Sequence, residues 1–258
     1  MSEIRIRFIR GEAVKYISHL DLMTVFERAL RRARIPVQYS QGFNPHPGMV
    51  FGLPLSVGVT SETEYADFKL QNEMNPEEFK NRLNADLPEG LKVTDAKAKK
   101  NTANIMADVA MASYDVLIAA RQKLDPGEIE NYVNEFIKQP EIIVLKEGKN
   151  GSKKIDIKPM ILELESKPIH QAGSWVKEYA GSLAGVGGLS FDPGNIFSLS
   201  MKLSAGSSAN LKPELLSAGF REFTGTDMKQ VKIHRTGLYV KKKGIITDPL
   251  ADQALIEI

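Results

Sequence analysis

Residues 4–36 read IRIRFIRGEAVKYISHLDLMTVFERALRRARIP, and this stretch predicts how the fold begins. Apolar and charged residues alternate over residues 4–10, which is the pattern of a half-buried strand. Ser18 and Asp21 then have the spacing of a capping box, which marks the start of a helix. Pro36 ends that helix because proline lacks an amide proton and its ring disrupts the preceding turn. A strand followed by an amphipathic helix is therefore expected.

The expected helix has an apolar and a charged side. Apolar residues at spacings of three and four line one side of a helix, and here they are Leu22, Met23, Phe26, Leu30 and Ala33. The opposite side carries Glu27, Arg28, Arg31 and Arg32. We therefore expect the first side to face the core and the arginines to face solvent.

The rest of the first 100 residues continues the alternation of strand and helix. Residues 49–53 and 64–70 have the composition and alternation of strands. Asn75 and Pro76 mark a helix start, because asparagine caps free amide groups and proline fits the first turn. Residues 91–94 predict a further strand. The resulting order of elements is the βαββαβ pattern of a ferredoxin-like fold.

The second half of the chain repeats this theme without a close sequence repeat. The patterns predict a strand, a helix, a hairpin, a strand, a helix and a strand at residues 114–118, 125–138, 141–165, 197–203, 213–223 and 230–240. A tight turn is expected at residues 147–151, and a glycine-rich surface loop at 181–195. We therefore expect an α+β protein made of two ferredoxin-like halves packed in tandem.

This order of elements predicts two domains. We expect an N-terminal ferredoxin-like domain at residues 1–100, a linker at 101–112, a C-terminal ferredoxin-like domain at 113–245 and a tail at 246–258. The Ser-His-Leu-Asp helix start and the GFNPHP loop both lie in the first domain.

The composition excludes several classes of site. The chain has 258 residues, of which 26% are charged, and a net charge of +2, as in an ordinary globular protein. It contains no cysteine, which excludes disulfides, iron–sulfur clusters and thiolate zinc sites in this chain. The first residues do not resemble a signal peptide, and no run approaches the roughly 18 apolar residues of a membrane span. A cytoplasmic protein without membrane contact is therefore expected.

Arginine is concentrated near the N-terminus. Residues 1–40 hold eight basic and four acidic side chains, which gives this segment a net charge of +4. The planar guanidinium group suits phosphate recognition better than the ammonium group of lysine does. The segment therefore predicts a nucleic-acid-binding surface, although a solvated charged face has the same pattern. The candidate residues are Arg5, Arg7, Arg28, Arg31 and Arg32.

A rigid polar loop follows the first helix, in the segment YSQGFNPHPGMVFGLP at residues 39–54. Asn44 and His46 each precede a proline, which favours an extended conformation. Side chains on such a rigid segment lose little entropy on binding. The alternative is a proline-rich turn whose histidine binds nothing. The candidate binding residues are Gln41, Phe43, Asn44 and His46, and the Phe43 ring is suited to stacking on a base.

Two histidines are candidates for catalysis. His19 lies at the helix start, and His46 would approach it if the loop folds back over that helix. Such a pair would support metal-independent RNA cleavage by general acid–base catalysis. Together with Asp21 the pair would offer three metal ligands, but the spacing matches no known ligand pattern. No metal site is therefore predicted, and binding is favoured over catalysis.

A loop of small residues joins the predicted strand at 197–203 to the helix that starts at Pro213. Free amide groups at a helix N-terminus favour anions, so this loop is a candidate site for one phosphate or carboxylate. It lacks the Gly-Lys-Ser/Thr ending of a Walker A loop, and a plain strand–helix connection is the alternative. The candidate anion-binding residues are Ser204, Gly206, Ser207 and Asn210.

Several of these motifs together resemble a known family. They are the Tyr-Ile-Ser-His-Leu-Asp helix start, the Ser-Gln-Gly-Phe-Asn-Pro-His-Pro loop, the Leu-Pro-Leu-Ser-Val-Gly-Val run, Glu64-Tyr65 and the later segments LSAGSSANLKPELL and HRTGLYV. The chain resembles the radical-SAM-linked protein family, a bacterial domain of unknown function that occurs alone or fused to a radical SAM protein. Gly48 departs from the family's loop, where lysine is common.

The resemblance implies work on RNA, because genes of this family lie beside a radical SAM protein and near ribonuclease G and ribosomal protein genes. We therefore expect a non-catalytic accessory protein that binds RNA, or a ribosome-related substrate, for a radical SAM partner. S-adenosylmethionine and an iron–sulfur cluster are expected only in that partner, and no cofactor in this chain. The alternatives are a metal-independent endoribonuclease that uses His19 and His46 and a purely protein-binding adaptor.

Overall fold

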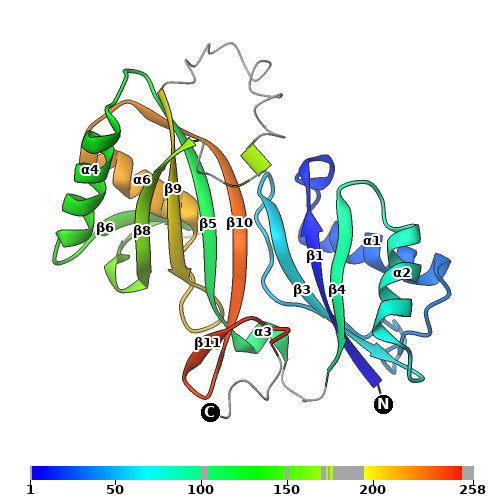
Figure 1. Ribbon diagram of the computed structural model, residues 1–258. Helices are drawn as coiled ribbons and strands as arrows, with labels where there is room; N and C mark the ends of the chain where they lie inside the picture. Colours follow the sequence, from blue (N-terminus) through cyan, green and yellow to red (C-terminus); the bar gives the residue numbers. More distant parts are fainter. Residues whose placement is uncertain are drawn as a thin grey trace. The chain divides into compact units, whose positions relative to one another are not determined.

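The computed structural model describes residues 2–99, 104–148, 151–169, 173, 175–176 and 195–251. The chain is an α+β protein with a large, mostly antiparallel sheet, which confirms the predicted fold class (Figure 1). It divides into two compact units. Unit 1 consists of residues 1–112, 205–208 and 235–258, and unit 2 consists of residues 113–204 and 209–234.

Unit 1 begins with a strand, a helix, two strands, a helix and a strand. Their bounds are β1 (Ser2–Arg10), α1 (His19–Arg32), β2 (Met49–Phe51), β3 (Thr60–Leu70), α2 (Pro76–Asp86) and β4 (Leu91–Ala98), with a short 3-10 helix η1 (Glu12–Val14) before α1. The order across the sheet is β4-β1-β3, β2 also pairs with β3, and all three pairings are antiparallel. The later elements are α3 (Ile105–Asp108), the C-terminal part of β10 (Met228–Lys242) and β11 (Ile245–Thr247), which pairs with β10.

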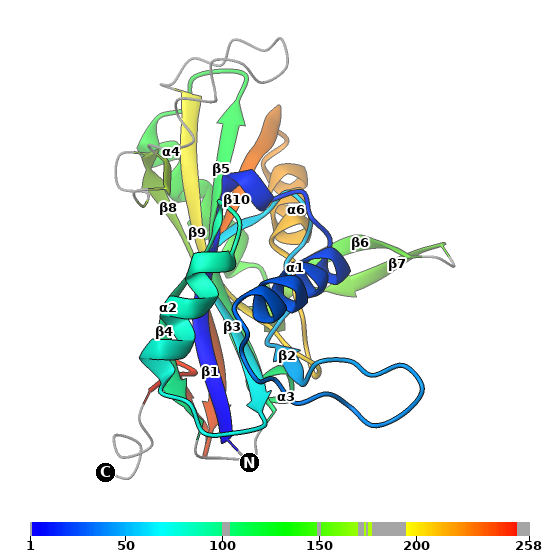
Figure 2. The same cartoon turned by 90° about the vertical axis from the view of Figure 1, so that its right-hand side faces the viewer.

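Helices α1 and α2 cover one face of the unit 1 sheet (Figure 2). The ring of Phe8 on β1 lies 5.1 Å from that of Phe26 on α1, and the ring of Phe68 on β3 lies 5.3 Å from that of Phe79 on α2. The predicted apolar side of α1 is confirmed, with Leu22, Phe26 and Leu30 buried and Met23 and Ala33 partly buried in this core. Apolar burial is the dominant favourable contribution to folding here.

The predicted helix starts are confirmed by their capping bonds. Ser18 Oγ accepts a hydrogen bond from the Asp21 amide at 3.1 Å, and the Ser18 amide donates to Asp21 Oδ2 at 3.3 Å, which completes the capping box of α1. Asn75 Oδ1 accepts from the Glu77 amide at 2.8 Å at the start of α2. These bonds satisfy amide groups that a helix leaves without partners in its first turn.

The structure corrects the predicted nature of β3. The alternation at residues 64–70 predicts a half-buried strand, but nearly all of β3 is buried, on both faces of the sheet. On the face away from the helices, Tyr65 bonds to Asp248 and Asp67 bonds to Arg5. Burial of a polar side chain costs little free energy where the side chain forms hydrogen bonds. The alternation of residues along one strand gives no information on which partners from other segments will form those bonds.

A buried cluster of charges lies at the other end of β3. Arg235 Nη1 on β10 lies 2.9 and 3.0 Å from the two carboxylate oxygens of Glu64 and donates to the Leu53 carbonyl oxygen at 3.2 Å. Arg10 is 1% exposed, and burial lowers its pKa; the charge of Glu64 opposes that shift, and the charge of Arg235 adds to it. The buried carboxylate of Glu64 therefore interacts with two buried arginines.

In the part of the chain that the structure describes in full, unit 2 contributes strands to the large sheet and contains helices α4 and α6 and a separate hairpin. The bounds are β5 (Val109–Ala120), α4 (Pro126–Lys138), β6 (Ile143–Gly148), β7 (Gly151–Asp156), η2 (Lys158–Met160), β8 (Ile161–Pro168), β9 (Ile196–Ser204) and α6 (Pro213–Thr224), with the N-terminal part of β10. The strand order is β10-β5-β9-β8, and β6 pairs with β7 in a separate two-stranded sheet. The rings of Phe136 on α4 and Phe220 on α6 meet at 5.4 Å.

Three predicted segments have different bounds or a different structure from those expected. The strand expected at residues 49–53 is shorter, because β2 ends at Phe51. The described part of the linker expected at residues 101–112 forms α3 and the start of β5, because Ile105 and Val109 are buried. The described part of the tail expected at residues 246–258 completes β11 and then buries Leu250.

Some predicted features lie outside the described residues. These are the centre of the hairpin turn at residues 149–150, the glycine-rich loop at residues 181–194 and residues 252–258 of the expected tail. The domain boundaries and the assignment of two ferredoxin-like halves in tandem stay predictions. The compact units differ from the predicted domains, since β5 and β10 each contribute residues to both units and residues 205–208 belong to unit 1.

Gly206 is predicted to be indispensable to unit 1. Its φ is +111°, and a Cβ at this position would overlap the carbonyl oxygen of Val109. Gly206→Ala should therefore lower the free energy of unfolding by about 2–4 kcal/mol, measured by urea denaturation. Gly244→Ala is the matched control, because its φ is +86° but nothing lies within 4 Å of the added Cβ. It should cost only about 1 kcal/mol, and equal effects of the two variants would contradict the steric explanation.

Glu64 is predicted to be essential for the stability of unit 1. Glu64→Gln removes the buried negative charge that faces the guanidinium groups of Arg10 and Arg235, so the free energy of unfolding should fall by about 3–5 kcal/mol. Glu27→Gln removes an exposed pair, in which Glu27 lies 3.0 Å from Arg31. That control should change stability by less than about 0.5 kcal/mol. A loss at Glu64 no larger than the loss at Glu27 would show that the buried cluster is not needed.

Candidate functional site

Residues 40–46, called the site loop below, extend from unit 1 between α1 and β2 (Figure 2). The two ends of the loop are joined at its base. The Ser40 amide donates to the His46 carbonyl oxygen at 2.8 Å, and the His46 amide donates to Ser40 Oγ at 2.9 Å. Below this base, the Gly48 amide donates to the Gln38 carbonyl oxygen at 2.6 Å. The Lys69 amide on β3 donates to the Gly48 carbonyl oxygen at 2.8 Å. The loop therefore projects from an anchored stem.

The tip of the site loop presents an aromatic ring and polar side chains to solvent. Phe43 is fully exposed, at 111% of its reference area. The other predicted binding residues of the loop, Gln41, Asn44 and His46, are also exposed. Gly42 has a φ of +132°, a conformation that glycine adopts without strain. Exposure of a whole phenyl ring is unfavourable in water, and a ligand that stacks on it would remove that contact with solvent.

The three predicted arginines of α1 are exposed but differ in their partners. Arg31 Nη2 lies 3.0 Å from Glu27, and Arg32 Nε lies 3.1 Å from Asp86 on α2. Within the described residues Arg28 has no ion pair. Exposed ion pairs contribute about 0–1 kcal/mol each, so a phosphate competes with them on nearly equal terms. Arg28 is consequently the arginine of α1 that is most available to an anion.

The predicted role of Arg5 does not agree with the structure. Its side chain is 3% exposed, and Nε and Nη2 bond to the two carboxylate oxygens of Asp67 at 2.6 and 2.9 Å. Nη1 donates to the Pro249 carbonyl oxygen at 3.2 Å. Arg7 is more accessible, but its guanidinium lies 3.6 Å from Asp95 and 3.7 Å from Asp248. These two arginines hold strands and the C-terminal segment together, and Arg5 is not available to a ligand.

Tyr65 and Asp248 were not identified as functional candidates in the sequence, yet they form the centre of this network. Tyr65 Oη donates to Asp248 Oδ2 at 2.8 Å. Burial, and then the negative charge of Asp248, raise the pKa of the Tyr65 phenol well above its usual value. Burial and the charge of Arg5 lower the pKa of Lys242 nearby. The alternation of β1 places Arg5 and Arg7 on one side of the strand, but no local pattern indicates that residues near 248 cover that side.

The two candidate catalytic histidines have different surroundings. His19 is half-buried, and its ring meets Phe51 edge-on at 5.7 Å between centroids. His46 lies on the exposed site loop, and its backbone amide bonds to Ser40. Among the described residues no ring contact joins the two histidines. The structure gives His19 a packing role, and their joint action as acid and base stays a prediction.

In the described part of the chain, no group of three or more histidine, cysteine, aspartate or glutamate side chains is arranged to hold a metal ion. None of the helices described is both long and apolar enough to span a membrane.

The predicted anion loop forms a tight strand–helix connection. The Ala205 amide donates to the Ala110 carbonyl oxygen at 3.0 Å, and the Leu211 amide donates to the Ser204 carbonyl oxygen at 3.0 Å. Lys212, at the N-cap of α6, forms no side-chain capping bond. Ser207 and Asn210 are exposed, as the prediction requires. The close approach of Gly206 to the Val109 carbonyl oxygen accounts for a glycine at this position without any ligand. Anion binding by Ser204, Gly206, Ser207 and Asn210 stays a prediction.

Comparisons with known proteins give one family and several distant structural likenesses. No curated protein matches the chain. Among solved structures, a Cbf5–Nop10–Gar1 complex has a TM-score of 0.48 at 11% identity and covers 92% of this chain. An H/ACA RNP bound to a substrate RNA containing 2′-deoxyuridine has a TM-score of 0.43 at 10% identity and covers 94%.

The chain spans about half the length of the matching chains in these structures, 48% and 47% respectively. Likenesses at this level establish no shared activity. A family model described as "Uncharacterized protein conserved in bacteria (DUF2344)" matches residues 3–213, which is most of the chain. The chain therefore belongs to the DUF2344 family of bacterial proteins.

Proposed function

We propose that this chain is an accessory protein that binds single-stranded RNA through the site loop and the exposed arginines of α1. The observation that carries the proposal is the fully exposed ring of Phe43 at the tip of an anchored loop. Proteins that bind single-stranded nucleic acid combine such aromatic platforms with basic groups along the backbone path. In this account the loop contacts bases and the helix contacts phosphates.

The other side chains of the site loop support RNA as the ligand. The amides of Gln41 and Asn44 both donate and accept hydrogen bonds, as the edges of unpaired bases require. The imidazole of His46 adds a second ring beside them. A surface made for a protein partner is usually richer in apolar side chains around its aromatic anchor. Here Phe43 is the one large apolar side chain of residues 40–46.

The basic part of the surface is smaller than the sequence predicts. Arg5 forms a buried ion pair with Asp67, and Arg31 and Arg32 each form an exposed ion pair with an acidic side chain. Arg28 forms no ion pair with any residue that the structure describes. We therefore expect a modest number of phosphate contacts, so stacking should contribute more to affinity than charge does.

The proposed partner is a radical SAM protein. This part of the proposal rests on the resemblance of the chain's motifs to the radical-SAM-linked family. The chain has no cysteine, so an iron–sulfur cluster and its S-adenosylmethionine would be held by that partner. The role of this chain would then be to bind and position the RNA substrate. Cytoplasmic location follows from the same proposal.

We also infer that each unit is a variant of the ferredoxin-like fold. Numbered within unit 1, the order β4-β1-β3-β2 is the 4-1-3-2 order of a βαββαβ sheet. In unit 2 the order β10-β5-β9-β8 has the same form once the separate β6–β7 hairpin is set aside. These orders support the predicted tandem halves.

Removal of the Phe43 ring tests the proposed stacking. Phe43→Ala should weaken binding of an unstructured RNA by about 5- to 150-fold, because stacking on an aromatic ring contributes roughly 1–3 kcal/mol per base. Binding is measured by fluorescence anisotropy with the full chain. Leu145→Ala is the control, since it removes an exposed apolar side chain, 57% exposed, from β6. Equal affinities for the wild type and Phe43→Ala would exclude the site loop as the RNA contact.

The salt dependence of binding tests the contribution of Arg28. For single-stranded RNA each phosphate contact changes the slope of log K against log salt concentration by about 0.7. Arg28→Ala should reduce the slope by roughly that amount and weaken binding at low salt. Arg121→Ala removes an arginine that is paired with Asp227 in unit 2 and should leave the slope unchanged. An unchanged slope in Arg28→Ala would remove α1 from the proposed site.

A further inference from the structure

The β6–β7 hairpin, called the ribbon below, extends away from α6 in unit 2 (Figure 2). Among the described residues it forms a separate two-stranded sheet. Val144 on β6 is 4% exposed, whereas the other described residues of both strands are exposed or half-buried. An isolated two-stranded hairpin is at best marginally stable in water. The ribbon therefore depends on an attachment at its base.

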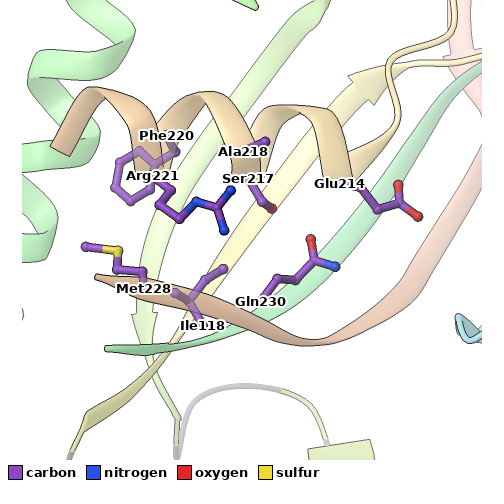
Figure 3. A pocket seen from close by; sticks show the side chains of 8 residues that line it. All are labelled: Ile118, Glu214, Ser217, Ala218, Phe220, Arg221, Met228 and Gln230. Carbon is purple, nitrogen blue, oxygen red and sulfur yellow. The ribbon is translucent and has the colours of Figure 1, made fainter. Parts of the chain in front are cut away.

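Helix α6 provides that attachment. Gly219 lies within α6, and a Cβ atom at this position would lie 2.6 Å from Val144 Cγ1. Glycine inside a helix is unfavourable relative to alanine, and the close approach of Val144 explains its presence here. Another side of α6 faces β5 and β10, where Phe220, Ile118 and Met228 line a cavity and are at most 4% exposed (Figure 3). The ribbon is thus mounted on a helix that is itself packed on strands.

One face of the ribbon carries two lysines side by side. Lys146 on β6 is the cross-strand partner of Lys153 on β7. Side chains alternate between the two faces of a strand, so this pair lies on the face that carries Val144, two residues closer to the turn. Lys154 is paired with Leu145, and these two side chains lie on the other face.

The pair of Lys146 and Lys153 is unfavourable for the free protein. Like charges directly opposite each other in an antiparallel sheet are destabilising. Both side chains are exposed, and neither forms an ion pair with a residue that the structure describes. Lysine also protects open strand edges, but a lysine opposite an uncharged residue, as Lys154 is opposite Leu145, does so without repulsion. The facing lysines therefore indicate an anionic ligand.

The composition of the ribbon favours a nucleic-acid duplex over a single strand. Proteins that hold single strands provide aromatic rings for the bases, and residues 143–156 contain no aromatic residue. A duplex keeps its bases stacked and presents its phosphates, and double-stranded RNA is recognised mainly through shape and backbone contacts. The ammonium group of lysine suits this role because it binds phosphate as a point charge.

We propose that the ribbon face with Lys146 and Lys153 binds the phosphate backbone of an RNA duplex. Paired strands lie about 4.7–4.9 Å apart, so both ammonium groups reach the same stretch of backbone. Contacts to phosphates carry no direct sequence information, and binding should therefore be independent of sequence. The substrate class that this adds is RNA with a double-stranded part. The choice of RNA over DNA rests on the proposed function.

The test is binding of a blunt RNA duplex to the full chain, measured by fluorescence anisotropy over a range of salt concentrations. Each phosphate contact to a DNA duplex changes the slope of log K against log salt concentration by about 0.9, and a similar change is expected for RNA. Lys146→Ala and Lys153→Ala should each reduce the slope by that amount. Lys154→Ala removes the same charge from the other face and should leave the slope unchanged. Unchanged slopes in the first two variants, or equal reductions in all three, would overturn the proposal.

Thermal unfolding of the free chain separates binding from folding. Because Lys146 and Lys153 repel each other across the ribbon, neither substitution by alanine should lower Tm. A lower Tm in both variants would show that the lysines support the fold, and it would contradict the argument from repulsion.

Other polymers identify the anion and separate the ribbon from the site loop. Tighter binding of a DNA duplex of the same sequence would overturn the assignment to RNA. Polyglutamate with the same number of charges should not displace the duplex, and full displacement would assign the lysines to an acidic protein. Phe43→Ala should not affect the blunt duplex, which offers no unpaired bases. Failure of the site loop to bind unstructured RNA would therefore leave the duplex result intact.

Discussion

The hydrogen-bonded ion pair between Glu64 and Arg235 is the interaction on which unit 1 depends. It joins β3 to β10 across 171 positions of sequence. Arg235 also bonds to the Leu53 carbonyl oxygen, and the neighbouring Arg10 donates to the carbonyl oxygens of Val14, Lys15 and Ile17. The cluster therefore fixes the segment before α1 and the segment after β2. The site loop joins the opposite ends of these two elements, and its stem is held there by the backbone bonds of Gln38, Ser40 and Gly48.

The charges of unit 1 divide into a structural and an exposed set. Arg5, Asp67, Tyr65 and Asp248 use their polar atoms on one another, and they attach the C-terminal segment to the sheet. Such a network contributes to a unique packing and offers nothing to a ligand. The side chains that remain exposed for binding are Phe43 and His46 on the site loop and Arg28 on α1. A protein with this distribution is better suited to holding an RNA strand by stacking than to attracting it by a strong positive field.

Local sequence patterns predicted the elements and the loop because their causes are local. The Ser18 and Asn75 caps, the apolar side of α1 and the exposure of residues 41–46 each follow from side chains a few positions apart. The burial of Arg5 and the pairing of Glu64 with Arg235 depend on residues that return from the far end of the chain. No local pattern contains that information, so the arginine surface was predicted too large.

The most direct test of RNA binding by the site loop is to cross-link the full chain to cellular RNA with ultraviolet light and identify the cross-linked peptides by mass spectrometry. The account predicts cross-links concentrated on the peptide that contains Phe43, with the ring of that residue as a site of attachment. Cross-links confined to other segments, or none at all, would contradict the claim that the site loop is the surface on which this family member binds RNA.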